Sequence, residues 1–235
     1  MIRVGTAGWS VPVPGEGTHL ERYGQCFNAT EINTSFYRPH RRSTYERWAE
    51  SVPEDFRFSV KLPKSITHER KLKDCSDLLE RFGEEVAGLG RKFGRLLVQL
   101  PPSLAFSGAA ADFLSVTRSR FRAAIALEPR HKSWFVPSVE DFLHETGIAR
   151  VAADPTPFAG GGEPGGDLGT SYFRLHGSPR LYYSRYDQAA LAAWSERIRA
   201  AADAWVIFDN TAEGAAFDNA TEMVESLNRA SGSRG

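Results

Sequence analysis

Cysteine is scarce in this sequence: Cys26 and Cys75 are the only two in 235 residues. Two cysteines cannot build the disulfide framework of a small secreted domain, and their spacing does not match that of a zinc site. The sequence thus excludes a disulfide-dense scaffold and favours a reducing compartment. We expect a cytoplasmic protein.

An excess of charge is also lacking, because 29 Lys and Arg residues balance 29 Asp and Glu residues. A neutral chain has no overall field to attract nucleic acid or a membrane surface, so any anion must be bound by a local cluster of cations. No apolar run approaches membrane-spanning length, and Met1–Val4 leads straight into a predicted strand without room for a signal peptide. We expect no membrane partner, and the sequence leaves the oligomeric state open.

The chain has 21 glycines but no glycine-rich nucleotide fingerprint. This absence argues against nicotinamide and P-loop chemistry. No cofactor is implied by the sequence. A divalent metal belongs only to one of the alternatives given below.

Short apolar runs are what the sequence does contain, and most of them end in a polar residue and precede a helix-like stretch. The predicted strands are Arg3–Ala7, Ala29–Phe36, Phe56–Leu62, Arg95–Leu100, Ala123–Leu127, Ala149–Ala153, Tyr172–Leu175 and Trp205–Phe208. Alternating strands and helices predict a parallel sheet, and about eight such units predict an α/β fold of the TIM-type (β/α)8 barrel class. In that fold the C-terminal ends of the strands carry the chemistry.

Helical periodicity and capping signals predict the connections between these strands. The predicted helices are His19–Phe27, one opening at a capping box in Ser43–Glu46, Asp77–Leu89, Ala110–Phe121, one starting at Pro137, Gln188–Ala202 and Ala216–Leu227. The segment Pro155–Gly169 is rich in glycine and proline and has no helical period, which predicts a loop in place of the helix between strands six and seven. We expect one domain over residues 1–228 and a polar tail over 229–235.

Several motifs resemble those of a known family, the DUF72 (YecE-like) proteins. They are Gly5–Ser10, Glu31–Tyr37, Phe56–Lys61, Thr67 with His68, Gln99–Pro102, Glu128–Trp134 and Arg174–Gly177. The resemblance extends over nearly the whole chain and implies a TIM-type barrel. It implies no activity, because the family is one of unknown function.

Two segments depart from the pattern of the DUF72 family. The segment after the first strand, usually longer and aromatic, is cut to about Val11–Thr18, which opens one side of the rim. The last strand ends in Phe208-Asp209-Asn210 where the family usually has Phe-Asn-Asn. Asp209 thus adds a carboxylate near the site.

Polar residues on several strands share the same parity. Since strand side chains alternate between the two faces, these residues are predicted to point inside the barrel near its C-terminal end. The inward set is Glu31 and Asn33, Ser59 and Lys61, Gln99, Glu128 and Arg130, and Arg174 and His176. Any one of them could be a satisfied core residue, but burying so many charged groups for structure alone is unfavourable.

The residue types in this ring predict acid–base chemistry on an anionic substrate. Glu31, Glu128 and His176 are the candidate catalytic residues, because neighbouring cations can hold one carboxyl ionised and another protonated. Arginine offers a fork matched to phosphate or carboxylate. The predicted substrate contacts are Asn33, Lys61, Gln99, Arg130, Arg174, Trp134 and Asn210.

The favoured hypothesis is a hydrolase or lyase acting on a small anionic molecule, such as a phosphate ester or a nucleic-acid-derived group. Phosphate should then stabilise the protein through Arg174 and Lys61. Intact nucleic acid has no support from the net charge. The alternatives are a non-catalytic binder of a small anion, a glycoside hydrolase, and an endonuclease-IV-like phosphodiesterase with a divalent metal on ligands drawn from His68, His131, His176, Glu31, Glu128, Asp154 and Asp209. No short ligand spacing supports the metal site, so none is predicted.

Overall fold

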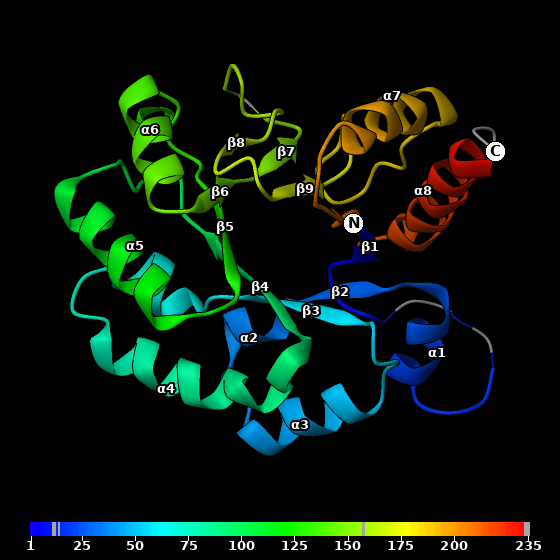
Figure 1. The fold of residues 1–235 in the computed structure, drawn as a ribbon, viewed down its shortest axis with the longest axis horizontal. Helices are drawn as coiled ribbons and strands as arrows, with labels where there is room; N and C mark the ends of the chain where they lie inside the picture. Colours follow the sequence, from blue (N-terminus) through cyan, green and yellow to red (C-terminus); the bar gives the residue numbers. More distant parts are fainter. Residues whose placement is uncertain (11–12, 14, 157, 233–235) are drawn as a thin grey trace.

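Runs of apolar and β-branched residues form the strands of the structure, a computed structural model that describes residues 1–10, 13, 15–156 and 158–232. The strands are β1 (Ile2–Thr6), β2 (Ala29–Ile32), β3 (Arg57–Lys61), β4 (Phe93–Gln99), β5 (Ala124–Glu128), β6 (Ile148–Arg150), β7 (Ala152–Asp154), β8 (Gly165–Gly166), β9 (Ser171–Leu175) and β10 (Ala204–Phe208). Helices surround the strands (Figure 1).

The helices follow the strands in alternation. The α-helices are α1 (His19–Cys26), α2 (Thr34–Tyr37), α3 (Arg42–Glu50), α4 (Ser76–Val86), α5 (Gly108–Arg120), α6 (Pro137–Glu145), α7 (Gln188–Arg199) and α8 (Ala215–Gly232). Three shorter helical turns are η1 (Ser65–Glu69), η2 (Ala87–Lys92) and η3 (Lys132–Trp134). In the described part of the chain, no helix is both long and apolar enough to cross a membrane.

The strands form two hydrogen-bonded sheets, with the orders β1–β10–β9–β7 and β2–β3–β4–β5–β6–β8. The pairings are parallel apart from the antiparallel pair of β6 and β8. The two sheets meet at an isolated parallel bridge between Ala7 and Glu31. They also meet where only Val151 separates β6 from β7. The fold is therefore α/β with mixed sheets, as the alternating pattern predicted at the level of fold class.

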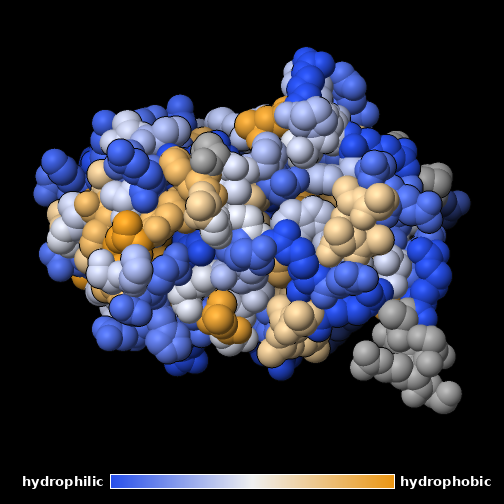
Figure 2. All heavy atoms as spheres, turned by 90° about the horizontal axis from the view of Figure 1, so that it is seen from above, coloured by the Kyte–Doolittle hydropathy of each residue, from blue (hydrophilic) through white to orange (hydrophobic). Residues whose placement is uncertain are grey.

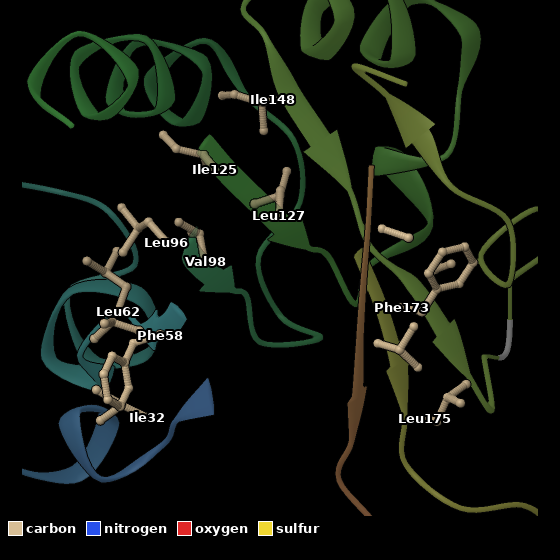
Figure 3. Close-up of a cluster of buried hydrophobic side chains, with 14 of the residues drawn as sticks. Ile32, Phe58, Leu62, Leu96, Val98, Ile125, Leu127, Ile148, Phe173 and Leu175 are labelled. Carbon is tan, nitrogen blue, oxygen red and sulfur yellow. The ribbon is translucent and has the colours of Figure 1, made fainter. Parts of the chain in front are cut away.

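Both faces of the strands are buried, each in a different apolar cluster. Residues such as Val98 and Leu127 pack with the helices in the larger cluster, and Figure 3 shows their side chains on the helix side of β4 and β5. Their neighbours in sequence, such as Leu97 and Ala126, belong to a smaller second cluster on the other face. Fully burying one such aliphatic side chain contributes about 1.5–3 kcal/mol. The second cluster lies on the face whose polar members form the candidate site.

The predicted capping box at Ser43 is wrong for a local reason. The helix α3 begins at Arg42, and its N-cap Arg41 makes no side-chain cap bond, so Ser43 does not cap it. The capping box of this chain is instead at Thr18, whose hydroxyl accepts from the Glu21 amide while the Glu21 carboxylate accepts from the Thr18 amide. Both segments read Ser/Thr-x-x-Glu, so the pattern alone could not choose between them.

Two predicted strands differ in the structure, because one is shorter and the other is divided. The strand predicted over Ala29–Phe36 stops at Ile32, and Thr34–Tyr37 is the short helix α2. The sixth predicted strand is divided at Val151 into β6 and β7. This division lets β6 pair with β5 while β7 pairs with β9.

The connection from β7 to β9 contains no helix in its described residues, in agreement with the predicted loop; residue 157 lies outside them. Arg150 anchors the connection from within. Its guanidinium bonds the Glu140 carboxylate and the backbone carbonyls of Gly160 and Glu163. Sequence analysis did not foresee the pairing of Gly165 and Gly166 with β6.

The last helix α8 continues to Gly232, into the segment predicted as a polar tail. Residues 233–235 lie outside the described range, as does part of the shortened segment Val11–Thr18. Figure 2 shows a surface on which polar residues predominate and apolar residues form separate groups. Isolated exposed apolar side chains of this kind are normal for a folded domain.

Candidate functional site

Five ionisable side chains meet at the C-terminal ends of the strands, and we name this group the carboxylate cluster. It consists of Glu31 at the end of β2, Glu128 at the end of β5, Arg174 on β9, His176 after β9 and Asp209 after β10. All five are buried. Burying several charges is tolerated only when they are paired and hydrogen-bonded.

Arg174 is the centre of the carboxylate cluster and is fully buried. Its Nε and Nη2 donate to the two oxygens of Glu31 at 3.0 and 2.7 Å, which is a bidentate fork. Nη1 donates to Glu128 at 2.6 Å, and Nη2 also donates to Asp209 at 2.9 Å. Burial alone would lower the pKa of Arg174, but the three carboxylates raise it well above its ordinary value. The fork is occupied, which contradicts the predicted role of Arg174 as an anion ligand.

His176 lies between two carboxylates of the same cluster. Its Nδ1 is 3.0 Å from Asp209 Oδ2, and its Nε2 is 3.3 Å from Glu128 Oε1. An ionised carboxylate only accepts hydrogen bonds, so both ring nitrogens must carry a proton for both bonds to form. Burial lowers the pKa of His176, yet Glu128 and the bond to Asp209 outweigh it and raise the pKa. The geometry thus stabilises an imidazolium.

Glu128 accepts more hydrogen bonds than the other carboxylates of the cluster. Besides Arg174 and His176, its Oε1 accepts from Gln99 Nε2 at 3.1 Å and from Arg130 Nη2 at 2.9 Å. Burial would raise its pKa, but Arg174, His176 and Arg130 together hold the pKa well below its usual range. Glu128 is therefore ionised at neutral pH. One of the two glutamates was predicted to be protonated, and Glu128 does not fit that role because it is ionised. The group of the cluster that carries a proton is His176.

Asp209, which the sequence placed near the site without a catalytic or substrate-binding role, is a member of the cluster. Burial raises its pKa, but Arg174 and His176 outweigh burial and lower it. Its Oδ2 accepts the bonds from Arg174 and His176, while Oδ1 has no hydrogen bond within the described residues. The alternation of β10 explains its place, because Asp209 continues the parity of Trp205 and Ile207, which the structure places in the inner apolar cluster. The inward charges are therefore three carboxylates, instead of the two predicted, beside Lys61, Arg130, Arg174 and the imidazolium of His176.

Lys61 lies at the end of β3 and differs from the other cations of the site. Its side chain is largely buried, and its Nζ lies 4.2 Å from the ring centroid of Phe36. No hydrogen bond or ion pair of this amine exists among the residues that the structure describes. Burial and Arg174 lower its pKa to about 8 against the opposing effect of Glu31, Glu128 and Asp209.

Arg130 is the more exposed cation of the site, with 30% of its side chain accessible. Its Nε and Nη2 donate to Glu128, and Nη2 also lies 3.5 Å from the Tyr182 hydroxyl. The other terminal nitrogen, Nη1, makes no bond to any described residue. We name Lys61, Arg130, Phe36, Tyr182 and Asn33 the rim, because they border the carboxylate cluster on the solvent side or just beyond the strand ends.

Below the carboxylate cluster, Tyr172 links it to the apolar interior. Its hydroxyl lies 2.8 Å from both Glu31 Oε2 and Ser59 Oγ. Burial and the charge of Glu31 raise the pKa of Tyr172 well above 10, so the phenol stays protonated. The ring stacks on Trp205 with centroids 6.0 Å apart. This contact fixes the height of Glu31 above the interior.

The remaining predicted substrate contacts divide into two groups. Gln99 bonds Glu128 as described, and Asn33 follows β2 with a buried Oδ1 that has no partner in the described chain. Trp134 is fully buried and donates from Nε1 to the Leu104 carbonyl, which contradicts its predicted place at a substrate.

Asn210 is also fully buried, and it holds loops together. Its amide nitrogen donates to the Ser184 carbonyl and to Asn219 Oδ1. This contradicts its predicted direct contact with substrate, since the donors are used within the fold.

The proposed metal ligands are not gathered in one place. His68 bonds Thr67, His131 bonds Ser133, and Asp154 accepts from Tyr186. Only Glu31, Glu128, His176 and Asp209 share a cluster, and their oxygens face Arg174 and His176. Within the described ranges, no group of three His, Cys, Asp or Glu side chains is arranged to hold a metal ion.

Comparison with known proteins gives consistent matches. The profile of a family described as "Protein of unknown function DUF72" matches residues 3–234. The UPF0759 protein YecE of Escherichia coli K12 is 32% identical over 166 residues, which cover 67% of this chain and 60% of YecE. The UPF0759 protein YunF of Bacillus subtilis 168 is 25% identical, with 97% and 95% of the two chains covered.

Two solved structures share the fold over almost their whole length. A DUF72 family protein from Enterococcus faecalis V583 aligns with a TM-score of 0.83 and 25% identity, covering 97% of this chain and 96% of its own. A DUF72 family protein from Thermotoga maritima MSB8 aligns with a TM-score of 0.81 and 26% identity, covering 97% and 99%.

Proposed function

The chain belongs to the DUF72 family, and we propose that it is an enzyme of hydrolase or lyase type that acts on a small anionic substrate at the C-terminal ends of its strands. The observation that carries this proposal is the pair of rim cations with unused donors, Lys61 and Arg130, beside a buried imidazolium. A substrate anion would complete the bonding of both cations. Cytoplasmic location is part of this proposal.

The proposal includes a closed (β/α)8 barrel. Its support is the order of the parallel pairings, which runs from β2 through β5 to β6, continues from β7 through β9 and β10 to β1, and returns to β2 through the bridge of Ala7 with Glu31. In such a barrel the strand ends form one mouth, where active sites are found. The proposal also includes one domain over residues 1–228, supported by the arrangement of the strands in a single ring, although the last helix α8 continues to Gly232.

The proposed roles differ between the rim and the buried carboxylate cluster. Lys61 and Arg130 bind the anion, with Gln99 and Asn33 as neutral contacts. Arg174 is a positioning residue that fixes Glu31, Glu128 and Asp209. His176 carries the proton that is transferred in the reaction. Asp209 passes this proton between His176 and the substrate, because its second oxygen has no partner in the described residues. Glu31 and Glu128 stabilise the positive charges rather than bind substrate directly.

Selective stabilisation by phosphate tests the anion site. At a concentration ten times the dissociation constant, a ligand that binds only the folded state adds about 1.4 kcal/mol, which raises the melting temperature by a few degrees. Phosphate should exceed chloride at equal ionic strength, and Arg130→Gln should remove the difference. Arg91→Gln is the matched control, because Arg91 pairs with Glu54 on the surface with 88% of its side chain exposed. Equal stabilisation by phosphate and chloride would disprove the anion site.

Turnover separates the enzyme from the non-catalytic binder, which remains the second candidate. The free donors of Lys61 and Arg130 favour binding in either case, whereas the buried proton on His176 favours catalysis. His176→Gln should abolish product formation from phosphorylated small molecules and leave the phosphate-specific stabilisation intact. Glycoside hydrolysis has less support, because Glu31 and Glu128 both hold Arg174 instead of flanking an open space.

A further inference from the structure

Lys61 is the buried cation of the site that has no partner to explain its burial. A lysine side chain only 8% exposed usually pairs with a carboxylate or a carbonyl. Three carboxylates lie close enough to influence its titration, yet all of them are bonded to Arg174. The fully buried side-chain atoms without partners in the described chain are Asn33 Oδ1, Arg95 Nε and Asn210 Oδ1. Lys61 Nζ is not one of them, so solvent reaches the amine.

The surroundings of Lys61 raise the fraction of its amine that is neutral at pH 7. Burial and the neighbouring Arg174 bring its pKa from 10.5 to about 8. At pH 7 about a tenth of such an amine is unprotonated, which is about 300-fold more than for a lysine with the pKa of 10.5. The ring centroid of Phe36 lies 4.2 Å from Lys61 Nζ, so the ring limits the directions in which the amine can point. A desolvated lysine of this kind is a nucleophile.

Two other side chains of the site, Asp209 and Arg130, each have a hydrogen-bonding atom without a partner in the described residues. Asp209 keeps Oδ1 without a partner in the described residues, and its charge interacts with that of Lys61. Arg130 keeps Nη1 free in the same sense, while its other nitrogens hold Glu128 and approach Tyr182. The region therefore offers an amine, a carboxylate oxygen that can accept or return a proton, and a cation for an anionic substituent.

We propose that Lys61 is a catalytic residue that forms a covalent imine with the carbonyl carbon of a small aldehyde or ketone carrying a phosphate or carboxylate group. This rests on the proposed function and narrows it to a lyase-type reaction of a carbonyl substrate. Arg130 binds the anionic group, and Asp209 serves the proton transfers.

The step is balanced without a further reactant. The Nζ lone pair attacks the carbonyl carbon, a C–N bond forms, and the carbonyl oxygen takes a proton to give a carbinolamine. Loss of that oxygen as water then gives the protonated imine. The sum is ammonium plus carbonyl giving iminium plus water. Asp209 takes the proton that the Lys61 ammonium loses before the attack and returns it to the departing hydroxyl. The proton that the carbonyl oxygen takes on the way to the carbinolamine is one that the attacking nitrogen loses.

Reductive trapping on the wild-type protein tests the imine. Glyceraldehyde 3-phosphate with cyanoborohydride at pH 7 converts an imine into a stable secondary amine, and peptide mass mapping locates it. Lys61 should be modified at least about tenfold faster than Lys64, because burial and the neighbouring Arg174 bring the pKa of Lys61 to about 8 and leave about a tenth of it as the nucleophilic free amine at pH 7. Lys64 is a suitable internal standard, since it is 45% exposed in its side chain and lies three positions along the chain. Modification that is no faster at Lys61 than at Lys64 overturns the proposal.

A second comparison tests the anionic part of the substrate. Glyceraldehyde lacks the phosphate, so it should modify Lys61 more slowly than glyceraldehyde 3-phosphate does. Arg130→Gln should bring the two rates together, whereas Arg91→Gln should leave them apart. Equal rates for both aldehydes on the wild-type protein overturn the assignment of Arg130.

The two proposals can fail separately. If phosphate stabilises the protein more than chloride but Lys61 is not trapped, the imine is disproved and the anion site stands. If Lys61 is trapped while phosphate and chloride stabilise equally, the anion site is disproved and the reactive amine stands. Because every primary measurement uses the wild-type chain, misfolding of a variant cannot produce either result.

Discussion

The carboxylate cluster and the rim border each other, but the charged groups of the two regions satisfy their hydrogen bonds in opposite ways. In the cluster, the guanidinium of Arg174 donates to three carboxylates, and both ring nitrogens of His176 face an acceptor. At the rim, Lys61 has no hydrogen-bonding partner in the described chain, and Arg130 uses only part of its fork. A buried charge must be satisfied by the protein itself, whereas a charge that reaches solvent can keep donors for a ligand. Similar residue types therefore serve structure in one region and binding in the other.

The largest effect expected from this comparison is that of Arg174→Met. Removing the guanidinium leaves three buried carboxylates without their shared partner, which should destabilise the protein by about 3–5 kcal/mol. Urea unfolding followed by circular dichroism measures the change, and Arg174→Lys should retain part of the loss because it keeps a charge but not the fork. A stability within about 1 kcal/mol of wild type would show that the cluster is not held by Arg174.

A pH series of the same measurement should reveal the proton on His176. Its pKa is raised in the folded state, so the native protein binds the proton more strongly than the unfolded chain does. The contribution of this proton to the free energy of unfolding is fully present below about pH 6.5 and is lost as the pH rises through the pKa of His176 in the folded state. The free energy of unfolding then falls by at most about 1.4 kcal/mol per pH unit. His176→Gln should flatten the curve in this window. An unchanged slope in the variant would assign the dependence to another group.

Lys61→Met makes the same chemical change as Arg174→Met but at the rim. No partner in the described structure loses a hydrogen bond, and the unfavourable burial of an amine is relieved, so the unfolding free energy should stay within about 1 kcal/mol of wild type or rise. The same variant should lose aldehyde trapping at this position. A loss comparable to that of Arg174→Met would show that Lys61 stabilises the cluster and would remove the distinction between the two regions.

The smallest effect should come from Lys64→Ala. Lys64 pairs with Glu69 at 3.3 Å, but both side chains are about half exposed. Exposed pairs of this kind contribute about 0.5 kcal/mol or less, and salt screens them further. Thermal unfolding at low and high salt should show almost no difference from wild type. A larger change would indicate that Lys64 has a role at the strand ends that the structure does not display.

The inner and outer faces of the strands could be predicted from sequence because the rule behind them is local. Leu97 and Gln99, or Tyr172 and Arg174, share a face by the alternation of an extended chain, whatever lies opposite them. The same rule would have added Asp209 to the site, had the parity of Trp205 and Ile207 been followed past the end of the strand. Trp134 and Asn210 show where the rule stops, since both lie beyond strand ends, where the path of a loop decides whether a side chain is buried.

Local sequence determined the elements of this protein, the α/β class and which polar residues lie on the inner face, because periodicity and parity act between near neighbours in the chain. Only the tertiary structure decided how those polar residues share their bonds. Glu31, Glu128 and Asp209 come from strands far apart in sequence, and the distances that bring all three to Arg174 are set by the pairing of the strands. Arg174 thereby became a saturated structural cation and Lys61 an open one, because hydrogen-bond satisfaction depends on position in space, which no local pattern encodes.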